Sequence, residues 1–449
     1  MNRREAAQRI KEWRGGLRSA ASTGRSISGS EYWWARAKDI IPRGTQTLSK
    51  GPDQFVDGVT PKYLDHGDGC HVWDVDGNEY IDYPMALGPV LLGYNYGPVV
   101  EAVTREVRKG TTFTLMSPLE VELAELLVEV IPCAEMVRFG KNGADATMAA
   151  IRIARAYTGR DHIAFCGYHG CHDWYAITTS LNKGIPRFNA GLIHPFEYNR
   201  PETLQNLFSL YSGKIGAVIM EVPAEDPKEH FLQQAIDIAH KQGALFILDE
   251  TCTGFRWSLG GAQQYYGIVP DLGCFGKGMA NGFSISAIVG KREFMKELND
   301  IFFSMTFSGE TIGLAASIAT IREIRQKGVI DYIWQQGKHL RQGLHRIKEE
   351  LGVDVDITGH PPRSGFVFRG SDGIESLDIK SLFLQEAHKR GVLFGGPVYI
   401  SFSHTEQDIE RTLDVSYEAM RTVREAIDEG GVDRFMEGKK IGTVYRSRR

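Results

Sequence analysis

The sequence predicts an α/β protein built around a mostly parallel β-sheet. From about residue 118 onward, segments with helical periodicity alternate with short apolar runs, which is the pattern of consecutive βαβ units. The runs are continuously apolar, as expected for parallel strands that are covered by helices on both faces. Chemically reactive side chains follow two of these runs, and they would lie at the carboxyl edge of the sheet, where open α/β sheets bind ligands.

The N-terminal 100 residues predict helices, a hairpin and a buried connection. Residues 1 to about 40 have helical character and end before Pro42. Asp76-Gly77 lies between two short alternating runs, which is a hairpin signal. Residues 83–100 carry no charge, but prolines and glycines interrupt them, so they predict a buried loop-and-strand segment and not a membrane span.

The central and C-terminal parts carry the remaining predicted elements. Apolar runs typical of strands cover residues 162–166, 215–220, 244–248, 272–275 and 284–289. Helical stripes cover residues 121–131, 146–157 and 231–241. After about residue 312 a long helical stretch leads to residues 338–351, and a smaller α+β segment with apolar runs at 365–368 and 391–394 follows.

Composition and charge exclude several classes of protein. The chain has 449 residues, 24% of them charged, and a net charge of −4 with no long basic run, so nucleic acid is not expected as its main partner. The six cysteines form no CxxC pair, which favours a reducing compartment. The N-terminus has no apolar signal core. We therefore expect a cytoplasmic protein with no membrane partner.

Asp249 and Lys277 are the strongest chemical signal. Asp249 follows the apolar run at residues 244–248, and Lys277 follows the next run between Gly276 and Gly278. A carboxylate and an amine on neighbouring strand ends suit pyridoxal 5'-phosphate (PLP). The carboxylate can pair with the protonated pyridine nitrogen, and the lysine can form a Schiff base. The sequence therefore predicts catalytic roles for both residues.

Two further segments would complete a cofactor site. Gly143 and Ala144 open a helix, whose free N–H groups can hold a phosphate, although a plain helix cap has the same pattern. Tyr168 follows a strand and can stack on an aromatic ring, with His169 at the edge of that site. The same loop holds two cysteines and two histidines. Its consecutive side chains diverge, however, so no metal site is predicted.

These motifs resemble the class III (fold type I) PLP-dependent aminotransferases, in particular the glutamate-1-semialdehyde 2,1-aminomutases. The resemblance covers roughly residues 30–430 and rests on residues 249–277, 146–155, 168–170, 306–309 and 403–409. It implies a large domain with a mostly parallel seven-stranded sheet over residues 71–325. An N-terminal segment (1–70) and a C-terminal part (326–449) would supply a small α+β domain.

The same resemblance assigns roles to single residues. Lys277 would be the aldimine lysine, and the other cofactor residues named above would keep the roles given there. Thr306 would reach the phosphate of the neighbouring subunit's cofactor. The resemblance therefore implies a homodimer with its active sites at the interface.

Several positions depart from the aminomutase pattern where the substrate is expected. Lys50 replaces an arginine that binds the substrate carboxylate, and a lysine lacks the bidentate geometry of arginine. Leu87 replaces a tryptophan, and Glu221 precedes valine where proline is usual. Tyr399 lies in a shortened segment that lacks a glutamate. These residues, with Arg363, are our candidates for the substrate pocket.

The sequence therefore predicts an aminotransferase that moves an amino group from a small-molecule donor to a ketone or aldehyde acceptor. The alternative is an aminomutase, an isomerase that moves the group within one substrate. A PLP racemase or decarboxylase, a cofactor-binding protein without catalysis, and a metal enzyme built on His169 and Cys171 are weaker alternatives. The departures listed above favour the aminotransferase, because they change the substrate region and leave the cofactor motifs intact.

Overall fold

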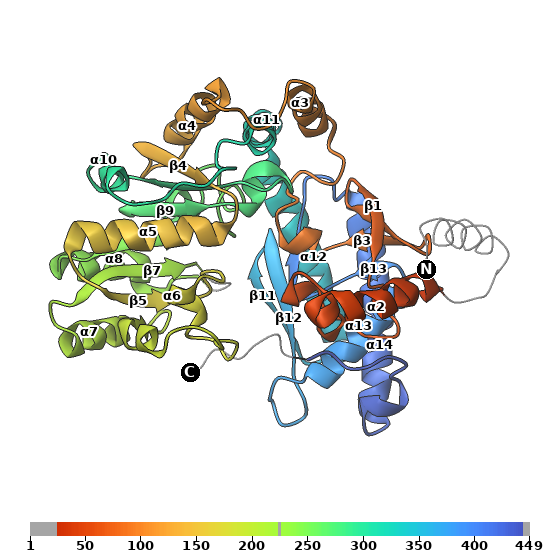
Figure 1. Cartoon of the computed structure of the whole chain (residues 1–449). Helices are drawn as coiled ribbons and strands as arrows, with labels where there is room; N and C mark the ends of the chain where they lie inside the picture. The colour runs from red at the N-terminus through yellow and green to blue at the C-terminus, as the bar shows by residue number, and fades with distance from the viewer. Residues whose placement is uncertain (1–24, 223–225, 443–449) are drawn as a thin grey trace.

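A seven-stranded sheet forms the centre of the computed structural model, which describes residues 25–222 and 226–442 (Figure 1). In spatial order the strands are β4 (Met136–Gly140), β10 (Ser286–Gly290), β9 (Leu272–Phe275), β8 (Leu245–Asp249), β7 (Ile215–Glu221), β5 (His162–Cys166) and β6 (Ile193–Pro195). Each strand from β9 to β6 in this order runs parallel to the next, and β10 runs antiparallel to both of its neighbours. The mostly parallel sheet predicted from the sequence is confirmed.

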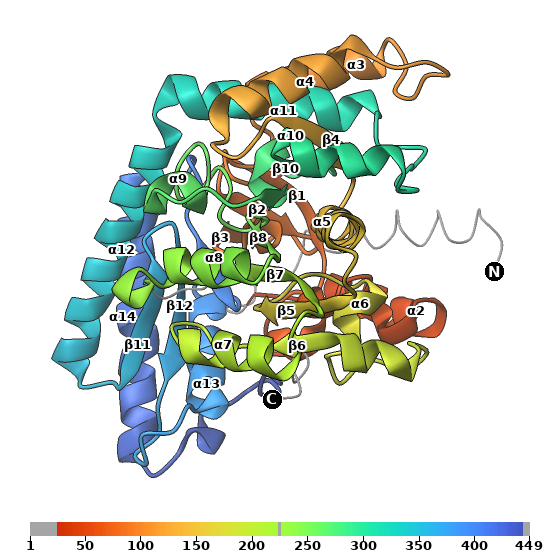
Figure 2. The ribbon, with the colours of Figure 1, turned by 90° about the vertical axis from the view of Figure 1, so that its left-hand side faces the viewer.

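Helices cover both faces of this sheet, which explains the continuously apolar strands (Figures 1 and 2). Leu245 and Ile247 of β8 pack in one cluster with α5 (Gly143–Thr158). Phe246 and Leu248 point the other way and pack in a second cluster with α7 (Pro201–Leu210) and α8 (Phe231–Lys241). Successive strand residues face opposite sides, so a strand between two helical layers needs apolar residues at every position.

Most of the other predicted elements are confirmed with small shifts of their ends. The predicted helices correspond to α4 (Pro118–Val130), α5, α8, α11 (Thr311–Lys327) and α12 (Val329–Leu351). The helix predicted up to residue 40 corresponds to α2 (Ser28–Ile40), and residues 1–24 lie outside the described residues.

The strand predicted within residues 83–100 is wrong. The chain there forms a short 3-10 turn (Met85–Leu87) and then α3 (Gly97–Val107). Met85, Ala86 and Leu87 have φ of 42°, 55° and 73°, which is left-handed backbone and cannot join a ladder. The segment is nevertheless buried, as the sequence predicts, because Val90, Leu91 and Leu92 are at most 4% exposed.

Two smaller sheets lie beside the large one. The first sheet consists of β1 (Leu64–Asp68), β2 (His71–Asp74), β3 (Glu79–Asp82) and β13 (Val392–Leu393). In it, β2 and β3 form the predicted hairpin around Gly77, whose φ is 86°, and β3 pairs in parallel with β13. The second consists of β11 (Val355–His360), β12 (Arg363–Phe368) and β14 (Pro397–Tyr399). Helices α12, α13 (Leu377–Lys389) and α14 (Glu406–Asp428) pack around them.

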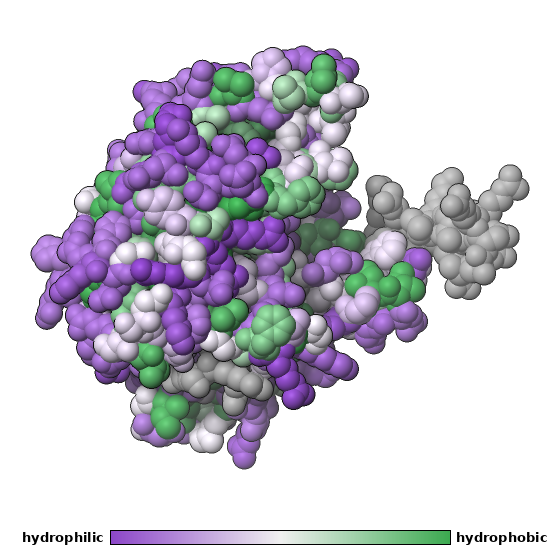
Figure 3. All heavy atoms as spheres, turned by 60° about the vertical axis from the view of Figure 1, so that its left-hand side comes forward, coloured by the Kyte–Doolittle hydropathy of each residue, from purple (hydrophilic) through white to green (hydrophobic). Residues whose placement is uncertain are grey.

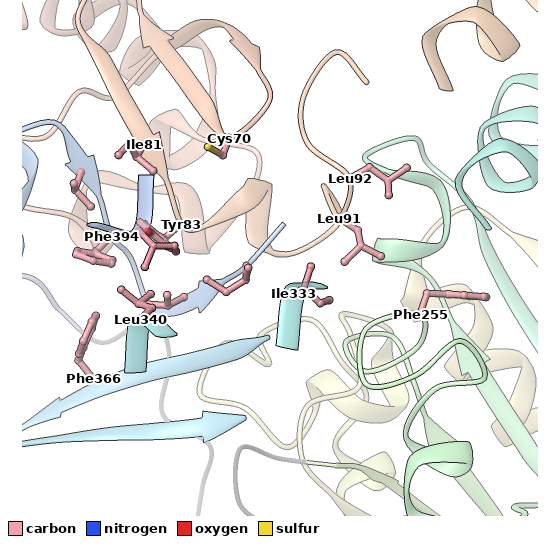
Figure 4. Close-up of a cluster of buried hydrophobic side chains, with 14 of the residues drawn as sticks. Cys70, Ile81, Tyr83, Leu91, Leu92, Phe255, Ile333, Leu340, Phe366 and Phe394 are labelled. Carbon is pink, nitrogen blue, oxygen red and sulfur yellow. The ribbon is translucent and has the colours of Figure 1, made fainter. Parts of the chain in front are cut away.

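One buried cluster joins these sheets to the large sheet (Figure 4). Tyr83 and Phe394 lie at its one end, and Leu91 and Phe255 lie at the other, with Ile333 of α12 between them. The apolar core is therefore continuous between the small sheets and the part of the chain that follows β8.

Helix α12 also fixes the start of β12. A Cβ on Gly337 would lie 2.0 Å from the backbone oxygen of Pro361, so only glycine allows this approach of helix and turn. The turn leads directly into Arg363, the first residue of β12.

The face in Figure 3 is mostly hydrophilic, with hydrophobic residues scattered over it. Among the helices of residues 25–222 and 226–442, none combines the length and apolarity needed to cross a bilayer.

Candidate active site

The ends of β8 and β9 bring Asp249 and Lys277 to the same edge of the sheet. The two strands pair in parallel, with Asp249 opposite Cys274. Asp249 is 3% exposed, and Lys277 begins a short 3-10 turn directly after β9 with a φ of 39°. A non-glycine residue in this left-handed region costs free energy and is frequent at functional sites.

His169 lies behind Asp249. Its Nδ1 is 2.8 Å from Asp249 Oδ2, and its Nε2 is 3.1 Å from the Cys166 backbone oxygen. Both ring nitrogens face acceptors, so the geometry suits a histidine that donates from both. The Thr251 N–H donates to Asp249 Oδ1 at 3.1 Å. These contacts hold the carboxylate in one orientation.

The N-terminus of α5 faces the same place. A Cβ on Gly143 would lie 2.7 Å from Thr251 Cγ2, and a Cβ on Gly276 would lie 3.8 Å from Gly143 Cα. The start of the helix, Thr251 and the Lys277 turn are therefore neighbours. Asp145 caps the helix by accepting from the Asn142 N–H, while the first N–H groups of a helix have no acceptor within the helix.

Tyr168 lies on the open side of this group. Gly170 has a φ of 99°, and a Cβ there would lie 2.6 Å from Ala144 Cβ, so the Tyr168 loop packs on the start of α5. Tyr168 is 47% exposed, and its ring meets Tyr175 edge-on at 5.4 Å. Burial raises the pKa of Tyr168, and the charge of Lys277 partly offsets this effect.

The cysteines and histidines of this loop contact different partners. His169 contacts Asp249, whereas His172 Nε2 lies 3.3 Å from Asp145 Oδ1 and Cys171 is exposed. The hydrogen bond from His172 lowers the pKa of Asp145 to about 2. His172 thus lies at the cap of α5 and does not share a site with His169.

Thr251 carries a buried hydroxyl that needs a partner. Its Oγ1 has no hydrogen-bond partner among the described residues, although it lies beside Gly143 and Gly276. Such an unsatisfied buried hydroxyl costs about 1–3 kcal/mol. A polar ligand at this position would recover that free energy.

Cys252 contacts the reactive amine. Lys277 Nζ lies 2.6 Å from Cys252 Sγ. Burial lowers the pKa of Lys277, but Cys252 and Tyr399 outweigh this effect, so the pKa is raised. No role was predicted for Cys252, because a cysteine between two threonines carries no local signal of its long-range partner.

Arg256 holds together the segments that carry Gly88, Tyr399 and Ile400. It is 1% exposed and donates from Nη1 and Nη2 to the carbonyls of Ile400 and Gly88. Its guanidinium lies 4.8 Å from the centre of the Tyr399 ring, an arrangement that attracts a cation. A Cβ on Gly88 would lie 2.8 Å from Tyr399 Cζ, so glycine is required there.

The predicted substrate residues fall into two groups. Tyr399 lies near Lys277 and Cys252, and we call these three residues the Lys277 cluster. Glu221 Oε1 accepts from the Tyr168 N–H at 3.2 Å. Lys50 and Leu87 instead line a cavity of about 300 Å³ together with Asp82 and Tyr94. Leu87 directly precedes Gly88, which packs against Tyr399, so Leu87 connects this cavity to Tyr399.

Thr306 lies elsewhere in the chain. It is exposed and lines a hollow of about 990 Å³ with residues 112–116, α4 and β4. Its predicted contact with a neighbouring subunit's cofactor is untested by a single chain.

Comparisons with known proteins agree with this geometry. The model of the family "Aminotransferase class-III" matches residues 56–404. A 3-aminobutyryl-CoA aminotransferase of Cloacimonas acidaminovorans is 35% identical, covering 87% of this chain and 96% of its own. A glutamate-1-semialdehyde 2,1-aminomutase of Desulforamulus reducens is 34% identical, covering 88% and 98%. The PLP internal aldimine form of the FumI protein of Sphingopyxis sp. MTA144 superposes with a TM-score of 0.83 at 28% identity, covering 89% and 97%.

Asp82 predicts a pH-dependent stability. Burial raises its pKa to about 6, against the hydrogen bond from Tyr94. Because the folded state binds this proton more tightly than the unfolded state, the stabilisation is complete below about pH 4 and is lost as pH rises through 6. Relative to Asp82→Asn, the wild type should lose about 2 kcal/mol of unfolding free energy between pH 4 and pH 8. Urea titrations of both proteins at each pH measure this, and parallel pH profiles would contradict it.

Proposed function

The chain belongs to the class III aminotransferase family, and on that premise we propose that it moves an amino group from a small-molecule donor to a ketone or aldehyde acceptor with PLP as cofactor. The convergence of Asp249, Lys277 and the N-terminus of α5 carries the proposal. These groups come from separate elements, and PLP needs a partner for each of its ring nitrogen, aldehyde and phosphate.

The residues of the site fit this cofactor. The N–H groups of Gly143 and Ala144 would hold its phosphate, and Thr251, whose hydroxyl is buried and unsatisfied, lies beside them. Asp249, with His169 behind it, would hold the protonated ring nitrogen. Tyr168 would stack on the ring from the open side. When bound, the cofactor supplies an electron sink for the negative charge that forms on the substrate carbon.

Lys277 would move the proton. Its Nζ is part-buried beside Cys252, and an amine beside the reacting carbon can take a proton and return it at a neighbouring atom. Asp249 would keep one orientation throughout, because His169 and the Thr251 N–H hold it in place. Cys252, in contact with Nζ, would fix the position of the amine between these steps.

Replacement of Lys277 tests the proposal directly. Lys277→Ala should lower the rate of amino transfer by at least about 1,000-fold, because both covalent attachment and the proton carrier are lost. Borohydride reduction followed by peptide mass spectrometry should find the cofactor attached to the wild-type peptide that contains residue 277. The exposed Lys296→Ala serves as the control. Transfer at a comparable rate in Lys277→Ala would show that the assignment is wrong.

Aminomutase activity is the second candidate function. It is favoured by the 34% identity to an aminomutase over nearly the whole chain. Against it, Lys50, Leu87, Glu221 and Tyr399 depart from the aminomutase pattern. The contacts around Lys277 serve either reaction, so the substrate must decide between them.

The requirement for a separate donor distinguishes the two candidates. We expect the purified enzyme loaded with PLP to aminate a carbonyl acceptor only when an amino donor is added, with one keto product per amine formed. Glutamate-1-semialdehyde alone should remain unchanged. Its stoichiometric conversion to 5-aminolevulinate without a donor would establish the aminomutase.

We further propose that the enzyme is a homodimer. The hollow that contains Thr306 is lined by exposed apolar side chains, including Leu115 at 76%, Met116 at 82% and Val121 at 59% exposure. Exposed apolar surface of this kind marks protein interfaces, and most homo-oligomers are symmetric dimers. In such a dimer Thr306 would reach the partner's cofactor. The free cysteines of the described residues agree with a cytoplasmic location, which we also propose.

Charges in the hollow should disrupt the dimer. Leu115→Glu with Met116→Glu would place two carboxylates in the interface, where their desolvation cost opposes association. Sedimentation should give the dimer mass for the wild type and the monomer mass for the double variant. As a control, Leu210→Glu, at an exposed position of α7, should leave the mass unchanged. A monomeric wild type would contradict the proposal.

A further inference from the structure

Arg363 presents a buried guanidinium nitrogen without a partner. Its Nη1 is buried and makes no hydrogen bond within the described part of the chain. A guanidinium remains charged at any physiological pH. A buried charged donor of this kind costs free energy until an acceptor, preferably an anion, satisfies it.

The backbone holds Arg363 over the Lys277 cluster. Arg363 is directly opposite Tyr399 in the antiparallel pair of β12 and β14, so the two side chains share one face of the sheet. The close contact between Gly337 and Pro361 fixes the turn that precedes Arg363. Arg363 is therefore placed by a strand and a helix and not by a loose loop.

The surroundings of Arg363 favour its charged form. Burial lowers the pKa of Arg363, but Cys252, Tyr399 and Glu221 outweigh this effect and raise it. The charge of Arg363 in turn lowers the pKa of Lys277, after the larger effects of burial and Cys252. The two cations are thus close enough to repel each other, and an anion between them would relieve the repulsion.

Arg256, the other guanidinium nearby, is already engaged. Arg256 uses Nη1 and Nη2 to bind the carbonyls of Ile400 and Gly88. Lys50 lines the cavity that contains the buried Asp82, and its charge lowers the pKa of that carboxyl, although burial has the larger, opposite effect. Arg363 is the guanidinium of this group with a donor left over.

We propose that Arg363 binds the carboxylate of an amino acid substrate whose amino group reacts beside Lys277. The enzyme would then use α- or β-amino acids as donors in preference to simple amines. Tyr399 lies next to the proposed carboxylate position. This inference rests on the proposed aminotransferase function and names the substrate class of its donor half-reaction.

Matched pairs of amines test the inference. L-Alanine and isopropylamine differ by a carboxylate in place of a methyl group, and so do 3-aminobutyrate and 2-aminobutane. Each would be mixed with the PLP-loaded enzyme, and single-turnover bleaching of the bound cofactor would be followed by absorbance. The wild type should react with the carboxylate member of at least one pair at least about 100-fold faster than with its uncharged partner.

Variants of Arg363 should remove this preference. Arg363→Gln should slow the carboxylate substrates about 100-fold and the uncharged amines less than threefold. Arg363→Lys should fall between, because it keeps the charge and loses the fork geometry. Arg369→Gln, whose native side chain forms a surface ion pair with Asp356 beyond the end of β12, serves as the control and should match the wild type.

A binding measurement separates recognition from folding. Calorimetric titration of the PLP-loaded enzyme with propionate, which has no amino group, should detect binding to the wild type and to Arg369→Gln and at least tenfold weaker binding to Arg363→Gln. Equal losses for both members of a pair, or a tenfold loss of PLP affinity in Arg363→Gln, would overturn the inference. If the wild type binds PLP but transfers no amino group from any amine, the proposed function fails, a result distinct from a wild type without carboxylate preference.

Discussion

The parallel pairing of β8 with β9 is the constraint on which the site depends. Asp249 lies opposite Cys274 in this pairing, and Lys277 follows in the next turn. A shift of one residue would turn Asp249 toward the opposite face of the sheet and away from its partners. Such a shift is opposed because α5 packs on one face of β8 and α8 on the other, so every residue of the strand would enter the wrong layer.

Local signals were sufficient for the parts of the fold that repeat. Continuous apolar runs predicted β5, β7, β8 and β9, and the rule for parallel sheets then placed Asp249 and Lys277 at one edge. Strand β4 escaped prediction because Arg138 interrupts its apolar run, and β6 escaped because it has only three residues, one of them His194. Arg256 showed no local signal of its role, since its acceptors lie 144 and 168 residues away in the chain.

The left-handed segment at Met85 to Leu87 also escaped prediction, and its conformation has a cost of about 1–3 kcal/mol per residue. Such a backbone persists only where the surrounding structure holds it. Here the Gly88 carbonyl accepts from the fully buried Arg256, and Tyr399 packs where a Gly88 side chain would be. The segment therefore links the cavity lined by Leu87 to Tyr399, which lies near Lys277. The strained backbone lies at the boundary of the proposed substrate pocket.

This arrangement separates the chemistry from the choice of substrate. Asp249, Gly143 and Tyr168 belong to the large sheet and its helices, whereas Tyr399 and Arg363 belong to a sheet formed by the C-terminal part of the chain. A change in the small sheet could thus alter recognition without moving the groups that we propose hold the cofactor. The lysine at position 50, where the aminomutase resemblance leads us to expect arginine, fits the same division. Lys50 lies by the cavity of the buried Asp82, whereas Nη1 of Arg363 has no partner among the described residues, so we propose the carboxylate site on the small sheet.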